Sequence, residues 1–213
     1  LWRKSLLSAL LPLLLSSAMA QGDASKAARF YEDALKRYEK RDVAGAIVQL
    51  KNALQADKTL LPVHVLLGKA LLSNGEAANA ELALTEALRL GVNRAEIVLP
   101  LARAVVAQGL QRQVLEQPRF ALAGLPSFVQ IDLLLIRSSA ASDMGDLQVA
   151  LREMEQARAL DPRLPAVWLA EVPIRIRARQ FREAMLAADK ALSLAPDSAE
   201  AWYQKGSIHH VQG

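Results

Sequence analysis

The sequence of 213 residues contains no cysteine, and aromatic residues make up only 5% of it, whereas 52% of its residues are hydrophobic. The absence of cysteine excludes disulfides, a cysteine nucleophile and a lipid-modified cysteine. Small aliphatic side chains without many bulky rings favour closely packed helices. The 10 glycines and 9 prolines are scattered, so the chain does not have the composition of a disordered or low-complexity segment.

Groups able to support catalysis are scarce as well. The only histidines are His64, His209 and His210. His209 and His210 are consecutive, so on a helix their side chains point in different directions and do not chelate one ion readily. The sequence has no glycine-rich phosphate loop and no metal-ligand spacing, and its Asp and Glu residues are typical of solvated helix faces. We therefore predict a protein that is not an enzyme and has no cofactor and no metal.

The N-terminus has the three zones of a secretory signal peptide. Arg3 and Lys4 precede an apolar run from Leu6 to Leu15, and Ala18-Met19-Ala20 forms a small-residue cleavage site. The run is shorter than the roughly 20 residues of a membrane span, and Pro12 interrupts it, so cleavage after Ala20 is favoured over retention as an anchor. We expect a signal peptide at residues 1–20, a periplasmic or secreted mature chain, and no membrane span after cleavage.

The mature chain would be nearly neutral. Loss of Arg3 and Lys4 leaves 24 basic and 22 acidic residues, a net charge near +2. This balance predicts no nucleic-acid partner. Without disulfides, an exported chain of this kind depends on packing for its stability.

Internal repetition dominates the remainder of the chain. A small residue recurs at spacings of 34, 34, 36 and 34, namely at Ala46, Ala80, Val114, Ala150 and Ala184. Seven residues later all five repeats carry alanine, at Ala53, Ala87, Ala121, Ala157 and Ala191. Helices approach to about 8–10 Å only where the facing side chains are small, so these positions predict close contacts between helices.

A second periodic segment precedes each of these helices and also carries a small residue near its middle, at Ala34, Gly68, Ala102, Ser138, Val172 and Gly206. Turn-forming residues separate the two segments, as in Asn74-Gly75, Gly109 and Gly145-Asp146. The unit is therefore an antiparallel helical hairpin of about 34 residues.

The unit resembles the tetratricopeptide repeat (TPR), most closely near the C-terminus. The matching residues are Trp168, Ala184, Ala191, Leu192, Pro196, Trp202 and Gly206. The resemblance implies an all-α fold, a TPR helical-hairpin solenoid that winds as a right-handed superhelix. It spans residues 24–213 in about five and a half repeats: 27–60, 61–94, 95–128, 131–164, 165–198 and a half repeat at 199–213. We expect kinks or shortened helices at Pro100, Pro118 and Pro173.

In TPR folds the first helix of each hairpin lines the concave face, and the resemblance implies that this face binds a protein or peptide. The implied binding residues are Tyr31, Leu35, Tyr38, Lys69, Leu72, Arg103, Val106, Leu135, Ser139, Ile176, Arg177, Tyr203 and His210. Lys69 and Arg103 occupy the same repeat position. They are interpreted either as a small cationic strip for an anionic ligand or as two ordinary solvated bases.

The first two repeats are similar to the N-terminal part of large TPR proteins of the PEP-CTERM/exosortase system, which accompany exopolysaccharide production in Gram-negative bacteria. The similar motifs are FYEDAL, AIVQLKNALQ and LLGKALL within Phe30–Gly91, and VLPLARAVVAQG at Val98–Gly109. This resemblance implies a periplasmic scaffold or adaptor. Two alternatives stay open: the N-terminal TPR region of an outer-membrane polysaccharide-secretion subunit, and that of an enzyme with a downstream catalytic domain.

Overall fold

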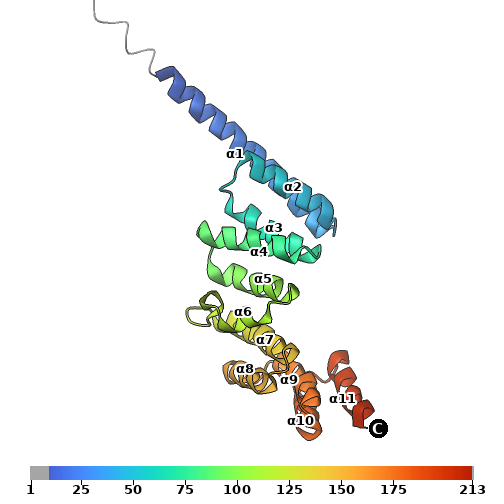
Figure 1. Cartoon of the computed structure of the whole chain (residues 1–213). Coiled ribbons are helices and arrows are strands. Elements are labelled where there is room, and N and C mark those ends of the chain that lie inside the picture. Colours follow the sequence, from blue (N-terminus) through green and yellow to red (C-terminus); the bar gives the residue numbers. More distant parts are fainter. Residues whose placement is uncertain (1–9, 213) are drawn as a thin grey trace, which may run out of the picture. The chain divides into compact units, whose positions relative to one another are not determined.

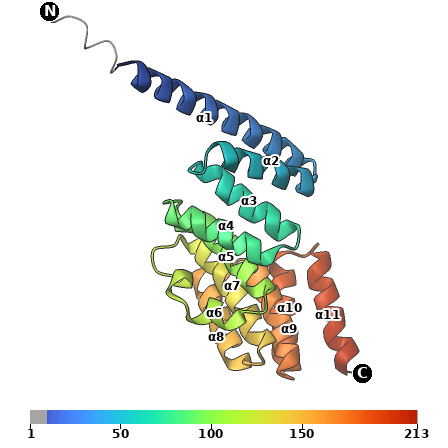
Figure 2. The ribbon, with the colours of Figure 1, turned by 45° about the horizontal axis from the view of Figure 1, so that its top comes forward.

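The part of the chain that the structure describes consists of helices joined by short turns and loops (Figure 1, Figure 2). The computed structural model describes the backbone of residues 10–212 and the side chains of residues 23–211. These residues form eleven α-helices, one 3-10 helix and no strand. The all-α prediction is therefore confirmed. The elements are α1 (Leu10–Glu39), α2 (Val43–Ala56), α3 (Leu61–Ser73), α4 (Ala77–Arg89), α5 (Arg94–Ala107), α6 (Gln111–Glu116), η1 (Pro118–Phe120), α7 (Ser127–Asp143), α8 (Leu147–Leu160), α9 (Pro165–Arg177), α10 (Phe181–Leu194) and α11 (Ala199–Gln212).

The predicted signal peptide, residues 1–20, lies largely outside the described residues. Only its backbone from Leu10 onward is described, as the beginning of α1. No helix within the described range is both long enough and apolar enough to cross a membrane. The signal peptide and its cleavage after Ala20 stay predictions.

The chain divides into two compact units, Leu1–Asn93 and Arg94–Gly213. In the first unit, α2 packs against α1 and α3, and α3 packs against α4. In the second unit, α6 packs between α5 and α7, α8 between α7 and α9, and α10 between α9 and α11. Within each unit, successive helices thus pack against one another, as expected for consecutive helical hairpins.

Small side chains form the close contacts between helices. Ala46, Ala53, Ala80 and Ala87 have no exposed surface. A very close approach between helices is at Gly68 in α3, where an added Cβ would lie 2.4 Å from Cγ of Leu84 in α4. Real Cβ atoms essentially never come this close to another heavy atom, so α3 and α4 depend on the missing side chain of Gly68.

The five hairpin turns share one backbone feature. The residue with a left-handed conformation stands at the same repeat position in all of them: Arg41, Gly75, Gly109, Gly145 and Arg179, with φ of 64°, 81°, 77°, 81° and 56°. Glycine adopts this conformation without steric cost, whereas arginine does not. The sequence pattern therefore identifies the turns at glycine and gives no such signal at Arg179.

The third hairpin departs from the repeat, in line with the expectation of a shortened helix at Pro118. Helix α6 contains six residues and ends at Glu116. Pro118 disfavours helical backbone at Gln117, which is extended with ψ of 137°. The prediction that Ala121 forms a close contact between helices is wrong, because Ala121 follows η1 and is exposed. Phe120, which is fully buried, fills the core beside it instead.

Pro100 and Pro173 do not shorten their helices. Pro100 lies inside α5, which has 14 residues, and Pro173 lies inside α9, which has 13. Each proline lacks the N–H that would bond the carbonyl four residues earlier. Both helices nonetheless continue for more than a turn beyond the proline, because packing against their neighbours stabilises them.

Candidate functional site

The first helices of neighbouring hairpins are joined by side-chain hydrogen bonds near their C-terminal ends. In the first unit, Tyr38 of α1 and Ser73 of α3 lie 3.2 Å apart between their hydroxyl oxygens. In the second unit, Arg177 of α9 donates from Nη1 to Oγ of Ser142 in α7 at 2.7 Å. Tyr38 and Ser142 occupy the same repeat position, as do Ser73 and Arg177. Both units therefore contain the same bridge, neutral in one and charged in the other.

The first unit holds five of the predicted binding residues. Tyr31, Leu35, Tyr38 and Leu72 are half-buried, and Lys69 is exposed. Burial raises the pKa of the Tyr31 hydroxyl above its ordinary value. Partly buried tyrosines with one polar end suit contacts with a partner protein, because the ring contributes apolar area and the hydroxyl a hydrogen bond.

The second unit brings three predicted residues together in one recess. Leu135, Ser139 and Arg177 line a cavity of about 200 Å³ between α7 and α9. Residues not predicted complete it: Ser138, Ser142 and Asp143 from α7, Met154 from α8, and Ala170, Pro173 and Ile174 from α9. The floor is buried and largely apolar, whereas Ser139, Asp143 and Arg177 at the mouth are exposed.

Other predicted residues lie outside this recess. Ile176 is half-buried and packs against the core cluster that contains Val172 and Ala184. Val106 is half-buried, and Arg103, Tyr203 and His210 are exposed. Lys69 and Arg103 belong to different units. The cationic strip therefore stays a prediction.

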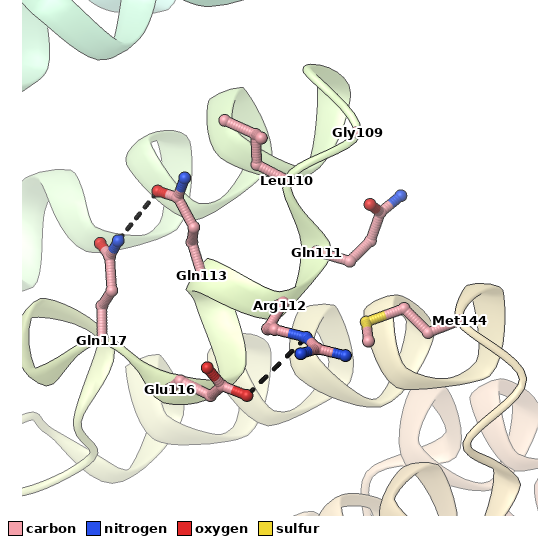
Figure 3. A pocket seen from close by; sticks show the side chains of 8 residues that line it. All are labelled: Gly109, Leu110, Gln111, Arg112, Gln113, Glu116, Gln117 and Met144. Atoms are coloured by element: carbon pink, nitrogen blue, oxygen red, sulfur yellow. Dashed lines mark hydrogen bonds and ion pairs between the residues drawn. The ribbon is translucent and has the colours of Figure 1, made fainter.

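A larger hollow of about 440 Å³ lies over α6, where the second helix of the third hairpin is short (Figure 3). The side chains of Leu110 and Met144 supply its apolar lining. Three amides, those of Gln111, Gln113 and Gln117, supply most of its polar groups. Sequence reasoning expected a short helix at Pro118 but did not predict this hollow, because its lining also includes Met144, which follows α7.

Comparisons with known proteins agree with this architecture. Residues 169–213 match the sequence model of the tetratricopeptide repeat. A tetratricopeptide repeat protein from Parabacteroides merdae has a similar structure, with a TM-score of 0.73 and 14% identity over 89% of this chain and 74% of that one. The fold is that of tetratricopeptide repeats. No curated protein matches the chain.

Two further solved structures are similar over most of the chain. YrrB, described as a TPR protein with an unusual peptide-binding site, gives a TM-score of 0.58 at 17% identity, covering 83% of this chain and 90% of its own. PilW, described as a widely conserved type IV pilus biogenesis factor, gives a TM-score of 0.63 at 15% identity. The match covers 88% of this chain and 86% of PilW. At these identities the likeness shows the fold alone.

The TPR register explains one set of hydrogen bonds at the repeat junctions. Trp168 and Trp202 donate from Nε1 to the carbonyl oxygens of Pro162 and Pro196, at 2.9 and 3.0 Å. His64 occupies the same repeat position, and its Nε2 lies 2.8 Å from the carbonyl oxygen of Lys58. A carbonyl only accepts, so Nε2 of His64 carries the proton. His64 therefore has a structural role at the junction.

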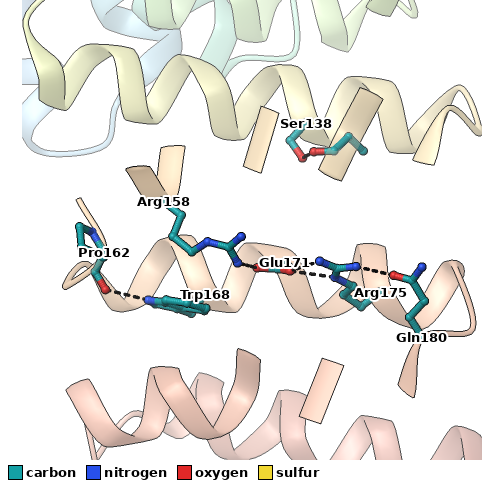
Figure 4. A network of polar contacts seen from close by, with 8 residues as sticks. Ser138, Arg158, Pro162, Trp168, Glu171, Arg175 and Gln180 are labelled. Atoms are coloured by element: carbon teal, nitrogen blue, oxygen red, sulfur yellow. Dashed lines mark hydrogen bonds and ion pairs between the residues drawn. The ribbon is translucent and has the colours of Figure 1, made fainter. Parts of the chain in front are cut away.

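The TPR pattern did not predict the buried carboxylates of Glu153 in α8 and Glu171 in α9. Glu171 is 4% exposed and lies between Arg158, at 3.0 Å, and Arg175, at 2.7 Å (Figure 4). Glu153 is 7% exposed and is bonded twice by Arg137, at 2.8 Å each. Buried ion pairs of this kind hold α8 to α7 and to α9. The sequence pattern did not indicate these ion pairs, because Glu and Arg are also common on solvated faces.

No group of three or more His, Asp or Glu side chains suited to a metal ion occurs in the described part of the chain. The titratable side chains in the α7–α9 recess are Asp143 and Arg177, which pair at 3.1 Å. The recess thus offers charge, hydroxyl groups and apolar surface, the groups used for binding.

Proposed function

We propose that the protein is a non-catalytic periplasmic TPR scaffold or adaptor for protein–protein interaction, linked to exopolysaccharide or PEP-CTERM/exosortase envelope systems. The observation that carries the binding role is the recess between α7 and α9. It combines a buried apolar floor with exposed serine, aspartate and arginine side chains at its mouth. First helices that present such a surface suit an extended segment or a helix of a partner.

The comparisons support this proposal in two ways. YrrB is described by its peptide-binding site, and PilW by its role in type IV pilus biogenesis. A peptide-binding site and a role in pilus biogenesis are therefore both compatible with this fold. The envelope context rests further on the predicted signal peptide and on the motifs within Phe30–Gly91.

Export is tested with a C-terminal reporter enzyme that is active only in the periplasm. The fusion with residues 1–213 is compared in a Gram-negative host with one that lacks residues 1–20. We expect reporter activity from the first fusion alone. Equal activity from both fusions, or activity from neither, contradicts periplasmic placement.

Partner binding is tested by cross-linking the exported chain in periplasmic extract. A groove variant of the α7–α9 recess, L135A/S139A/R177S, is compared with an outer-face variant, V48A/L82A, whose residues are 57% and 70% exposed on α2 and α4. We expect the same periplasmic partner with the wild type and the outer-face variant, and its loss with the groove variant. Recovery of cytosolic partners alone, or equal recovery with both variants, contradicts the proposal.

A further inference from the structure

Arg177 is only partly engaged within the protein. Its side chain is 54% exposed and bonds through Nη1 alone, to Oγ of Ser142 at 2.7 Å and to Oδ1 of Asp143 at 3.1 Å. Its Nε and Nη2 bond no side chain or backbone group among the described residues. These two nitrogens form one edge of the guanidinium, the geometry that binds both oxygens of a carboxylate.

The two existing bonds hold that edge in place. Ser142 is 6% exposed and lies on the wall of the recess, so one nitrogen of Arg177 is fixed against a buried hydroxyl. Asp143 restrains the same nitrogen from the exposed side. A guanidinium that is already oriented loses less side-chain entropy on binding a ligand.

The recess beside Arg177 is the size of a side chain. Its volume of about 200 Å³ is below the roughly 300–1,000 Å³ that small-molecule sites occupy. Met154 and Ile174 on its floor are almost fully buried, and Leu135 forms part of its wall. It therefore suits one apolar side chain of a partner rather than a free metabolite.

We infer that the α7–α9 recess binds an extended peptide that places an apolar side chain on the floor and an Asp or Glu carboxylate on the Nε/Nη2 edge of Arg177. This inference rests on the proposed function, which it deepens by naming the ligand. A carboxylate fits better than a phosphate, because Asp143, 3.1 Å from Nη1, repels a dianion more strongly than a single charge.

The first unit provides the reason for one test variant. Ser73 stands there at the repeat position of Arg177, and it bonds the neutral Tyr38. Arg177→Ser therefore introduces the residue that the first unit has at this repeat position, and we expect the variant to fold. Arg177→Lys keeps the charge and removes the two-nitrogen edge. Arg152→Ser, on an exposed residue of α8 outside the recess, is the control for the loss of one positive charge.

The probes are capped octapeptides of Gly and Ser, each with one Val and one Glu separated by one to four residues, and matched peptides with Gln in place of Glu. Binding to the exported chain is measured by fluorescence polarisation. We expect the wild type and R152S to bind the best Glu peptide about tenfold more tightly than its Gln counterpart, the effect of one charge-assisted pair. R177K should keep a smaller preference, and R177S none.

The outcomes separate the two proposals. If the wild type binds Glu and Gln peptides equally, or if R177S keeps the preference, the assignment to Arg177 is wrong and the groove function stands. If no peptide binds the wild type, the inference about the recess is wrong, and the cross-linking experiment alone decides the proposed function. Thermal unfolding of R177S and R177K checks that each variant is folded. If only one of them folds, its preference for Glu over Gln peptides is compared with that of the wild type.

Discussion

The hairpins α3–α4 and α5–α6 follow the same repeat pattern and are held together in different ways. In the first, the close approach of Gly68 and Leu84 allows two full helices to pack along their length. In the α5–α6 hairpin, α6 ends after six residues, and the remainder of the repeat is an irregular segment, residues 117–126. A shared sequence register therefore does not guarantee a shared helix when proline interrupts it.

Arginine side chains stabilise the irregular segment in place of helical hydrogen bonds. Arg94 donates from Nη2 to the carbonyl oxygens of Ala121 and Ala123, at 2.9 and 2.6 Å. Arg137 donates to the carbonyl oxygen of Phe120 at 3.3 Å while it pairs with Glu153. Backbone carbonyls that leave a helix must find donors elsewhere, and two helices supply them here.

The largest expected effect is the loss of Arg137. Arg137→Ala leaves the carboxylate of Glu153, 7% exposed, without its partner and removes a donor to the irregular segment. We expect the free energy of unfolding to fall by about 3–5 kcal/mol, the usual result of removing one partner of a buried ion pair. Urea unfolding followed by circular dichroism measures the loss.

The control replaces both charges, as in R137M/E153L. Since apolar residues of similar volume substitute well for a buried pair, the double variant should recover most of the lost stability. A double variant as unstable as Arg137→Ala would show that the contact with Phe120, rather than the ion pair, dominates.

A second pair of variants tests the close contact in the regular hairpin. Gly68→Ala places a Cβ 2.4 Å from Cγ of the fully buried Leu84, and overpacking of this kind costs about 1–3 kcal/mol. Gly206→Ala, at the same repeat position in α11, meets no atom within 4 Å and should stabilise the helix by up to about 1 kcal/mol. If Gly68→Ala lowers the melting temperature and Gly206→Ala raises it, packing against Leu84 explains why glycine stands at position 68. Changes of the same sign in both variants would contradict this explanation.

The hairpins were predictable because small residues at a fixed spacing leave few alternatives for packing. The short α6 was predictable from Pro118, but the irregular segment was not, because its donors Arg94 and Arg137 are far from it in sequence. For the candidate site, the register identified Leu135, Ser139 and Arg177 in the recess. It could not identify Asp143 or Pro173, since their contribution depends on how α7 and α9 pack.

A third prediction distinguishes local loss of stability in the irregular segment from loss of stability in the rest of the second unit. Arg94→Ala removes two donors to exposed loop carbonyls, so we expect a global loss of about 1 kcal/mol or less. Protection from hydrogen exchange should fall mainly at residues 117–126, because local openings expose the segment with the fewest helical bonds. Unchanged exchange at these residues would show that buried Phe120 and the bond from Arg137 hold the segment without Arg94.

The turns offer a smaller comparison between two hairpins of the first unit. Arg41 has φ of 64° where the next turn has Gly75 at 81°. Arg41→Gly should stabilise slightly, because relief of left-handed strain, about 1 kcal/mol, is offset in part by the greater freedom of glycine in the unfolded chain. Gly75→Ala should destabilise by about 1 kcal/mol. Chemical unfolding of both variants checks the signs, and a destabilising Arg41→Gly would mean that the arginine side chain contributes more than its backbone costs.

The smallest effect concerns the helix caps. Asp42 precedes α2 and accepts from the backbone N–H of Gly45 at 3.0 Å and from Arg37 at 2.9 Å, whereas α6 has Leu110 at this position and no side-chain cap. These two bonds, the one from Gly45 first, lower the pKa of Asp42 below its ordinary value.

The carboxylate of Asp42 therefore contributes stability above its unfolded-state pKa of about 4 and loses it as the pH falls through the lower folded-state pKa. Asp42→Asn keeps a good cap but removes the charge. We expect the difference in urea midpoint between wild type and D42N to be largest near pH 7, to decrease below about pH 4 and to vanish once the pH lies below the lowered folded-state pKa of Asp42. A difference that persists in acid would show that the cap acts through geometry and not through charge.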